Sequence, residues 1–382
     1  MKIRQVLVTS AQAFASELPR LAAIDPNFVL VFGAPSYFEN SAVAQALADR
    51  LPGVPALGCS TAGEIAGTAV REQSCVVTAV RFNSIRVRMA TTTFTEMLDS
   101  RAAGRRLGME LADAELRAVM VFGQGVRING SALIEGLVDT LGPELPITGG
   151  LAGDYGAFSR TWTLSPKGVS DSEIVAVGFV GSTLKFGHGS FGGWETFGPA
   201  RKVTRSEGNV LYELDGEPAL AFYKRYLGDY AKDLPVSGLL FPFGMLGEDR
   251  GAKGLIRTIL GIDENAGSLI LAGDIDPEGY LKLMHASTDS LIDGAEAAAL
   301  AARLPQEKGV ADESLCVLVS CIGRRLVMGD LVDGEVEAVA AVVGDSAVLT
   351  GFYSNGEISP FTPGVHCKLH NQTMTITTIA ED

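Results

Sequence analysis

The sequence predicts a mixed α/β fold of two domains, each with mixed sheets and packed helices, built on a repeated strand–helix–strand–turn–strand unit. The chain has 382 residues, 47% of them hydrophobic, which is more than one ordinary core organises. Continuous Val/Leu/Ile runs of about five residues are typical of interior strands. A similar pattern of strand, helix and glycine-rich turn recurs three times. We expect one domain over residues 1–195 and a second over 196–382.

The first two repeats share their spacing. One begins with VLVFG at Val29, continues through SAVAQALADRL and ends with GCSTAGEI. The other begins with VMVFG at Val119, continues through SALIEGLVDTL and ends with GGLAGD. Phe32 to Glu64 and Phe122 to Asp154 both span 32 positions, which predicts that the two acids occupy equivalent places.

The third repeat begins with CVLVSCIG at Cys316, continues through EVEAVAAVVG and ends with AVLTGFYSNGEI. Its segment GFYSNGEI shares Gly, Gly, Glu and Ile with GCSTAGEI at the same offsets. A further strand is expected after each repeat, in SCVVTAVRF, EIVAVGFVG and QTMTITTI, because β-branched residues favour strands.

The domain boundary is expected in the glycine-rich segment FGHGSFGGWETFGP, residues 186–199, which predicts a flexible turn. The second domain is then expected to open with a helix that includes ALAFYKRYL, because Glu217-Pro218 supplies a helix start.

Composition argues against several classes of protein. A net charge of −14 disfavours binding to nucleic acid or anionic lipid. The apolar runs fall short of the ~20 residues of a membrane span, and the N-terminus lacks the apolar core of a signal peptide. The five cysteines are odd in number and form no C-x-x-C pair, which is typical of thiols in a reducing compartment. We therefore expect a cytoplasmic protein.

Several motifs together resemble the tandem N- and C-terminal domains of the FIST family. They are GCSTAGEI, GGLAGD, the stretch from Gly198 to Tyr223, FPFG followed by IRTIL and GSLILAGDI, and GFYSNGEISPF with LHNQTMT. They follow the family's order over nearly the full chain. The resemblance implies a bacterial, stand-alone intracellular sensor that binds a small ligand such as an amino acid. It also implies a separate signalling partner, such as a histidine kinase or a cyclic-nucleotide signalling protein. A subset of the family implies an alternative, a haem-based nitric oxide sensor.

The acids at the ends of the repeats are candidate ligand-binding groups. Glu64, Asp154 and Glu357 follow glycine-rich turns at strand ends, where α/β proteins usually bind ligands. Such a carboxylate suits a ligand ammonium, while amides around Gly58 or Gly149 suit a ligand carboxylate. The alternative is that each acid stabilises its turn.

Other residues near the turns complete the predicted site. Arg324 either holds an anionic ligand bidentately or is ion-paired within the protein. Tyr353 either lines a pocket or packs in the core, and Asn355 is explained by the left-handed conformation that Asn tolerates. The predicted ligand-binding residues are Gly58, Ser60, Glu64, Gly149, Gly150, Asp154, Arg324, Tyr353 and Glu357.

The sequence favours a binding protein over an enzyme. Gly187-x-Gly189-x-x-Gly192 is followed by no helical pattern, and no phosphate loop or H-E-x-x-H occurs. Ser60 lacks the G-x-S-x-G spacing of a nucleophile and is interpreted as a turn hydroxyl. A hydrolase is the alternative from another class, and it would require a base near Ser60, Cys59 or Cys321.

Four histidines are candidates for a haem ligand. His188 fits best, because Phe186, Phe191 and Trp194 lie nearby in a stretch whose glycines leave room. His370 is predicted to make a structural hydrogen bond, and His285 to lie on a strand or at the surface. His366 beside Cys367 is a weak metal signal.

Overall fold

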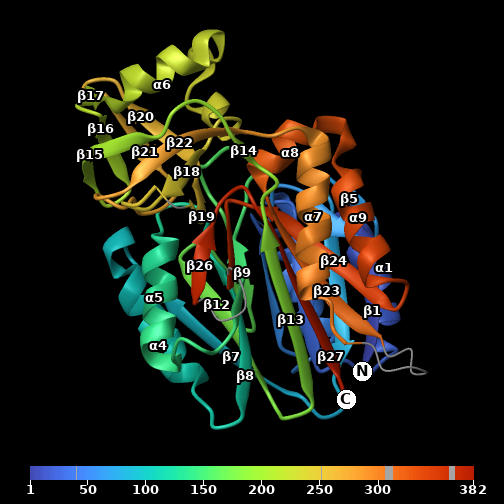
Figure 1. Ribbon diagram of the computed structural model, residues 1–382. Coiled ribbons are helices and arrows are strands. Elements are labelled where there is room, and N and C mark those ends of the chain that lie inside the picture. The colour runs from blue at the N-terminus through green and yellow to red at the C-terminus, as the bar shows by residue number, and fades with distance from the viewer. Residues whose placement is uncertain (40, 251, 306–312, 361–365) are drawn as a thin grey trace.

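The computed structural model describes residues 1–39, 41–250, 252–305, 313–360 and 366–382. Within these ranges the strands form three six-stranded sheets and one nine-stranded sheet. The three smaller sheets and their helices make a first body, and the nine-stranded sheet makes a second body beside it (Figure 1). The predicted fold class, a mixed α/β protein with mixed sheets, is therefore confirmed.

Three units build the first body, and they share one succession of elements. An edge strand is followed by a helix, a central strand, further helix, a parallel strand, a hairpin and a last strand. The first unit comprises β1 (Lys2–Val8), α1 (Ala11–Ala22), β2 (Phe28–Gly33), α2 (Ser36–Glu39), α3 (Ala42–Arg50), β3 (Ala56–Ser60), β4 (Glu64–Ala66), β5 (Ala69–Arg71) and β6 (Cys75–Arg81). The second comprises β7 (Arg86–Thr93), η1 (Met97–Asp99), α4 (Ser100–Leu111), β8 (Leu116–Gly123), α5 (Gly130–Leu141), β9 (Ile147–Leu151), β10 (Thr163–Ser165), β11 (Gly168–Ser170) and β12 (Glu173–Val180).

The third unit follows the same plan but is interrupted after its edge strand. It comprises β13 (Leu184–Phe191), α7 (Thr288–Ala302), β23 (Ser314–Cys321), α8 (Ile322–Met328), η4 (Gly329–Leu331), α9 (Asp333–Val343), β24 (Ala347–Ser354), β25 (Gly356–Pro360), β26 (Cys367–His370) and β27 (Met374–Glu381). The three repeats and the three following strands expected from the sequence are thus confirmed.

The central strand of each unit is parallel to the third strand and antiparallel to the last. Parallel neighbours need a crossover connection, which helical residues supply in every unit. Central strands are covered on both faces, and all six residues of β2, FVLVFG, are buried. This burial explains why the sequence shows continuous apolar runs instead of alternation.

The hairpin of each unit joins the sheet of another unit. The hairpin β4–β5 pairs with β24, β10–β11 pairs with β3, and β25–β26 pairs with β9. The resulting strand orders are β1-β6-β2-β3-β10-β11, β7-β12-β8-β9-β25-β26 and β13-β27-β23-β24-β4-β5. Each sheet is therefore completed by two strands from a different unit, and the units interlock in a ring.

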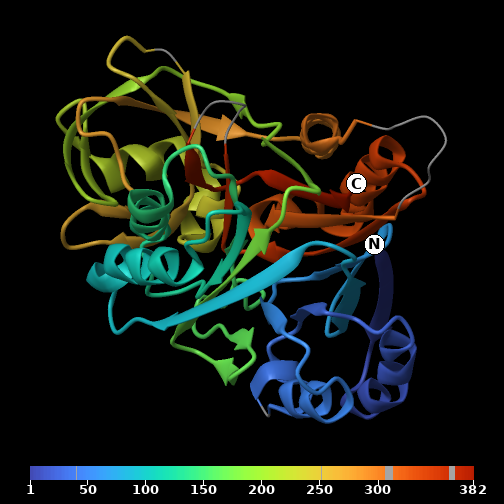
Figure 2. The same ribbon diagram turned by 90° about the horizontal axis from the view of Figure 1, so that it is seen from below.

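Helices cover the outside of the ring, and the sheets face one another inside it (Figure 2). In α5, for example, Leu133, Ile134 and Leu137 are buried at a helical spacing against the sheet. The inner faces of all three sheets share one core, to which Phe28, Phe179 and Val317 contribute. None of the helices in the described part of the chain is long and apolar enough to span a bilayer.

The glycine-rich segment before the predicted boundary is a strand, so the expectation of a flexible turn there was wrong. Residues 184–191 form β13, which pairs with β27 along its length. A Cβ on Gly187 would overlap the carbonyl oxygen of Ala302, and one on Gly189 would overlap that of Ala298. The glycines therefore allow α7 to pack closely on the strand.

The second body is an insertion between β13 and α7. It comprises β14 (Glu195–Thr196), β15 (Arg201–Glu207), β16 (Val210–Leu214), β17 (Glu217–Pro218), α6 (Ala219–Leu227), η2 (Gly228–Asp233), η3 (Val236–Leu239), β18 (Phe243–Leu246), β19 (Ala252–Arg257), β20 (Ile259–Asp263), β21 (Ser268–Leu271) and β22 (Tyr280–His285). The helix expected after Pro218 is present as α6, but strands precede it where the sequence predicted a helical opening. The predicted boundary at 195/196 falls at the start of this body, whereas residues 288–382 return to the first body.

Candidate functional site

The three turns that follow the third strands meet in a closed ring of backbone hydrogen bonds. The amide of Ala62 donates to the carbonyl of Tyr353 at 2.8 Å. Gly153 donates to Ser60 at 2.8 Å, and Asn355 donates to Leu151 at 3.2 Å. Each unit thus donates to one neighbour and accepts from the other, which brings the predicted site residues of all three repeats to one end of the first body.

The centre beneath this ring is packed with aromatic side chains. Ring centroids of Phe32 and Phe122 lie 5.3 Å apart, those of Phe32 and Phe352 4.8 Å, and those of Phe122 and Phe352 5.7 Å. All three side chains are fully buried. The axis of the ring is therefore apolar core, and the polar side chains of the turns lie around it.

Gly58 and Gly149 are required by close strand packing, and Gly351 shares the arrangement in the third unit. A Cβ on each would overlap the carbonyl oxygen of the central strand, on Val31, Val121 and Leu318 respectively. A Cβ on Gly150 would crowd the Val319 side chain. Packing alone accounts for these glycines, and their predicted role in ligand binding stays a prediction.

Glu64 and Glu357 make matching contacts in the first and third units. Glu64 accepts from Thr61 Oγ1 at 2.5 Å and from the amide and hydroxyl of Ser74 at 3.0 and 2.7 Å. Glu357 accepts from Ser354 Oγ at 2.7 Å and from the amide and hydroxyl of Thr373 at 3.1 and 2.9 Å. Each carboxylate therefore ties its turn to the start of the last strand.

Burial raises the pKa of both carboxyls. The pKa of Glu64 lies above its ordinary value because burial outweighs its hydrogen bonds, and burial raises the pKa of Glu357 to about 7. The Tyr155 hydroxyl also donates to Glu64, at 3.0 Å. These carboxylate oxygens are occupied by protein donors, and binding of a ligand ammonium there stays a prediction.

Asp154 does not occupy the place of Glu64, so the equivalence inferred from their shared spacing was wrong. Strand pairing aligns Phe32 with Cys59 but Phe122 with Gly150, so Asp154 follows its strand one residue sooner than Glu64 does. Asp154 instead accepts hydrogen bonds from the amides of residues 158, 159 and 160 at 3.0, 2.7 and 3.1 Å. Its carboxylate organises the loop that leads to β10.

Ser60, Arg324 and Tyr353 also bind partners within the protein. The Ser60 hydroxyl donates to the Gly153 carbonyl at 2.8 Å and accepts from the Trp162 amide at 3.0 Å. Arg324 and Tyr353 both hydrogen-bond to Glu335, and all three side chains are fully buried. The ion-paired alternative for Arg324 matches this geometry. A ligand-binding role for Ser60, Arg324 and Tyr353 stays a prediction.

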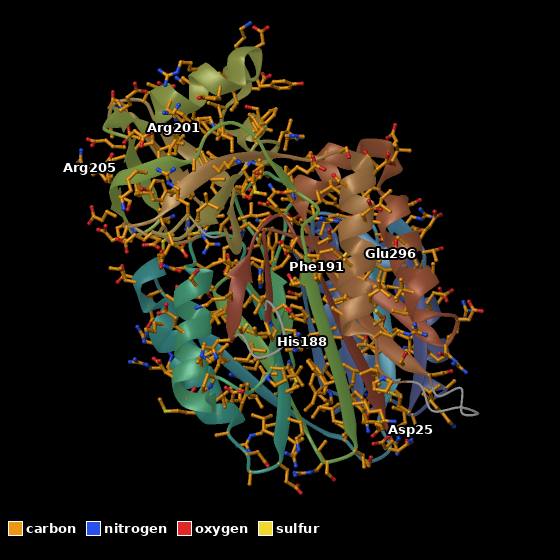
Figure 3. All side chains as sticks on the ribbon, in the orientation of Figure 1. Asp25, His188, Phe191, Arg201, Arg205 and Glu296 are labelled. Carbon is orange, nitrogen blue, oxygen red and sulfur yellow. The ribbon has the colours of Figure 1, made fainter. Side chains whose placement is uncertain are left out.

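The residues around His188 do not form a slot for haem. His188 lies in β13, and burial lowers the pKa of its imidazole. Phe186 packs against Phe179 in the core, whereas Phe191, on the same strand, is exposed (Figure 3). The Trp194 indole donates to the Gln372 carbonyl. The aromatic residues are thus dispersed, and haem ligation by His188 stays a prediction without support from this arrangement.

Of the other three histidines, one makes a buried hydrogen bond and two lie at the surface. His370 Nε2 lies 2.9 Å from the Ser359 carbonyl, which agrees with a structural hydrogen bond. His285 ends β22 and is exposed. His366 lies at the surface, and the residues that the structure describes contain no group of three or more side chains suited to a metal ion.

Three buried amide oxygens mark the junction between the two bodies. Asn355 Oδ1, Asn371 Oδ1 and Gln372 Oε1 have no hydrogen-bond donor among the described residues. These residues are 7%, 1% and 0% exposed, so bulk water does not replace the missing donors. Buried polar atoms without partners are rare in folded proteins and call for an explanation.

The orientation of two of these amides is fixed by their nitrogens. Asn355 Nδ2 donates to the Gly125 carbonyl at 3.3 Å, and Gln372 Nε2 donates to the Leu239 carbonyl at 2.8 Å. Rotating either amide by half a turn would place two oxygens face to face. The unpartnered atoms are therefore acceptors.

The backbones of these three residues lie at one end of the β25–β26 hairpin. Glu357 pairs with His370, which brings Asn355 and Gln372, two residues beyond each, to the same end. The inserted body touches this end twice, through the Leu239 carbonyl and through Trp194. We name Asn355, Asn371 and Gln372 the junction amides.

Sequence reasoning missed these residues although signals for them were present. Asn371 and Gln372 lie within LHNQTMT, which carried part of the family resemblance. Asn355 was assigned to a left-handed turn, but it is not among the described residues with positive φ. The left-handed conformation therefore does not explain why asparagine stands at position 355.

Comparison with known families identifies the family of this chain. The FIST N domain model matches residues 27–217 and the FIST C domain model matches residues 219–360. The chain therefore belongs to the FIST family, whose domains are associated with small-ligand sensing in signalling. It is also 40% identical over 102 residues to the uncharacterized protein MJ1623 of Methanocaldococcus jannaschii, a match that covers 25% of this chain and 19% of that protein. The chain thus spans about a fifth of that relative's length.

Among solved structures, the chain is similar to a cyanuric acid hydrolase from A. caulinodans. The TM-score is 0.40 and the sequence identity 11%, with 99% of both chains covered.

Proposed function

We propose that this protein is a sensor that binds a small ligand at the junction amides and reports its presence to a separate signalling protein. The observation that carries the proposal is that three residues at one end of the β25–β26 hairpin each bury an amide oxygen without a donor among the described residues. Leaving one buried acceptor unpaired costs about 1–3 kcal/mol, so a ligand that supplies donors would recover much of that free energy. The FIST membership supports the sensing role.

The chemistry of the junction amides favours a ligand with several N–H donors. In Asn355 and Gln372 the unpaired atoms are acceptors, and an ammonium group offers three donors while a primary amide offers two. Hydrogen bonds from a charged donor are about twice as strong as neutral ones. An amino acid, the ligand class that the resemblance implied, carries such an ammonium group.

The position of the site supports a signalling role. Gln372 lies in the bend between β26 and β27 of the first body, and it contacts the inserted body through Leu239 and Trp194. A ligand that binds Gln372 would favour one arrangement of the two bodies over others, and a partner would read that population shift. A histidine kinase or a cyclic-nucleotide signalling protein of the cytoplasm is the partner class we propose.

The state of the nucleophilic side chains favours a sensor over the alternative hydrolase. Burial raises the pKa of the Cys59 and Cys321 thiols, which disfavours a reactive thiolate. The Ser60 hydroxyl is committed to two backbone partners. None of these three side chains is activated as a nucleophile, which favours ligand binding over hydrolysis at the turns of the first body.

The proposal is tested by measuring thermal unfolding with each of the twenty standard amino acids, followed by calorimetric titration of those that stabilise the fold. A ligand at 100 times its dissociation constant stabilises the folded state by about 2.7 kcal/mol. Asn355→Ala and Asn371→Ala should each weaken binding about tenfold, because each removes a hydrogen bond worth roughly 1.5 kcal/mol to a charged donor.

Asn27→Ala is the matched control. Its amide is satisfied at both ends by the backbone of Phe82, at 2.9 Å each, and it belongs to the first unit. This variant should lower stability without changing ligand affinity. Equal affinity in the wild type, Asn355→Ala and Asn371→Ala would refute the junction site, and failure of every amino acid to bind would refute the ligand class.

A further inference from the structure

Arg257 is a buried cation of the inserted body that faces the first body. It ends β19 and is 4% exposed. Its Nε donates to the Asp274 carbonyl at 3.0 Å, and its Nη1 donates to the carbonyls of Ile256 and Leu369 at 3.1 and 3.4 Å. All three acceptors are neutral backbone groups.

The charge of Arg257 has no counter-ion among the residues that the structure describes. Among the described residues, no carboxylate oxygen lies within 4.0 Å of its guanidinium, although Arg324, the other deeply buried arginine discussed above, is paired with Glu335. Burial lowers the pKa of Arg257 to about 10, and the more distant Asp274 carboxylate opposes this only in part. Burial lowers the pKa of His370 to about 4, and the charge of Arg257 adds to that decrease. An uncompensated buried charge is costly, and a bound anion would compensate it.

Arg257 adjoins the junction amides along one short segment of chain. It donates to Leu369, which precedes Gln372 by three residues. Ile256, the neighbour of Arg257, also lies near Gln372. Its Cδ1 and the Gln372 carbonyl oxygen are each 3.3 Å from one point, the position that a Cβ on Gly192 would take. Three residues span at most about 10 Å even when fully extended, so one small molecule can reach both groups. The hydroxyl of Thr258, next to Arg257, is buried and also lacks a partner.

We propose that Arg257 binds the acidic group of the ligand whose N–H donors are held by the junction amides. This assignment rests on the proposed function and narrows the ligand class to molecules that carry both an acidic group and an amino or amide donor. The planar guanidinium suits a carboxylate or a similar oxyanion. Arg257 is then the residue that separates such ligands from simple amines.

The test compares each amino acid that binds with its C-terminal amide, which keeps the ammonium group and lacks the carboxylate. Calorimetric titration of the wild type should give at least tenfold weaker binding for the amide. Arg257→Gln should weaken binding of the acid to the level of the amide and leave the affinity for the amide unchanged. Arg257→Lys, which keeps the charge without the planar fork, should give an intermediate affinity for the acid.

Arg205→Gln is the control for a change of charge in the inserted body. Arg205 lies at the outside of that body (Figure 3), with its side chain 63% exposed in an ion pair with Glu213. This variant should leave both affinities unchanged. An acid-to-amide ratio in Arg257→Gln equal to that of the wild type would overturn the assignment of Arg257 while leaving the junction site intact.

A measurement without ligand provides a second test. Arg257→Met removes an unpaired buried charge, so the melting temperature of the ligand-free protein should stay the same or rise. A fall as large as that caused by Arg324→Met would show that Arg257 is structural and would overturn the proposal. Loss of amino acid binding in Asn355→Ala but not in Arg257→Gln overturns this inference alone, whereas no binding to the wild type overturns the proposed function as well.

Discussion

Arg324 and Glu335 form an ion pair at 2.6 Å with both side chains fully excluded from solvent. The pair joins α8 to α9 of the third unit. Arg324 also donates to the carbonyls of Gly192 and Leu291, which lie just before and just after the inserted body. One buried guanidinium therefore holds both connections to the insertion against the first body.

Removing Arg324 should destabilise the protein strongly. We expect Arg324→Met to lower the free energy of unfolding by about 3–5 kcal/mol, because it leaves the Glu335 carboxylate buried without a cation. The double variant Arg324→Met/Glu335→Leu should recover part of that loss. Urea denaturation measures both. The exposed pair of Arg225 and Glu217 is the control, since Arg225→Met should cost less than about 1 kcal/mol. Equal losses in the two single variants would contradict this account.

The stability contributed by Glu357 should depend on pH. Its folded pKa of about 7 lies above the ordinary value of 4.5, so folding favours the protonated form. The contribution is therefore fully present below pH 4.5 and is lost as the pH rises through 7. Glu357→Gln stays uncharged, and between pH 4.5 and 8 it should gain on the order of 3 kcal/mol relative to the wild type. Denaturation over this range measures the difference, and a difference independent of pH would rule out the shifted pKa.

The glycines beside the central strands should be intolerant of a side chain. In Gly351→Ala the new methyl group would overlap the Leu318 carbonyl oxygen, and backbone cannot move aside cheaply. We expect a loss of about 1–3 kcal/mol, as for other overpacked sites. Gly261→Ala is the control, because there the nearest atom is the end of the flexible Ile270 side chain, at 3.3 Å. Thermal unfolding should show a clear loss for Gly351→Ala and little change for Gly261→Ala.

Trp194 should report ligand binding by its fluorescence. Its indole donates to the Gln372 carbonyl at 2.8 Å, so a ligand that engages Gln372 should alter the surroundings of the indole. In a Trp162→Phe background, emission should change saturably with the dissociation constant found by calorimetry. Adding Asn355→Ala should shift that titration to higher ligand concentration. Calorimetric binding without any change in emission would place the ligand elsewhere.

The sequence predicted the repeated units well because their central strands are buried on both faces. VLVFG, VMVFG and CVLVSC are continuous apolar runs for that reason, and all three became central strands. The exchange of hairpins was not predictable in the same way. Short strands such as β4 and β10 carry no sign of which sheet they will join, since pairing partners are decided by packing between units.

The junction amides could not be singled out from the sequence, for a physical reason. The sequence predicted charged residues such as Glu64 and Arg324 as ligand-binding groups, but both side chains bind partners within the protein. The junction amides are uncharged. The sequence does not distinguish an amide whose oxygen has a hydrogen-bond donor from an amide whose oxygen has none. Only the positions of the surrounding donors distinguish them.

The exchanged hairpins also constrain how the chain can fold as it is synthesised. The sheet of the first unit needs residues 163–170, and the sheet of the second unit needs residues 356–360 and 367–370. Neither can be finished when its own last strand emerges from the ribosome. Pairings so distant in sequence form slowly, and unfinished sheet edges stay open to wrong partners in the meantime. The newly made protein therefore stays vulnerable to aggregation until nearly the whole chain has been released.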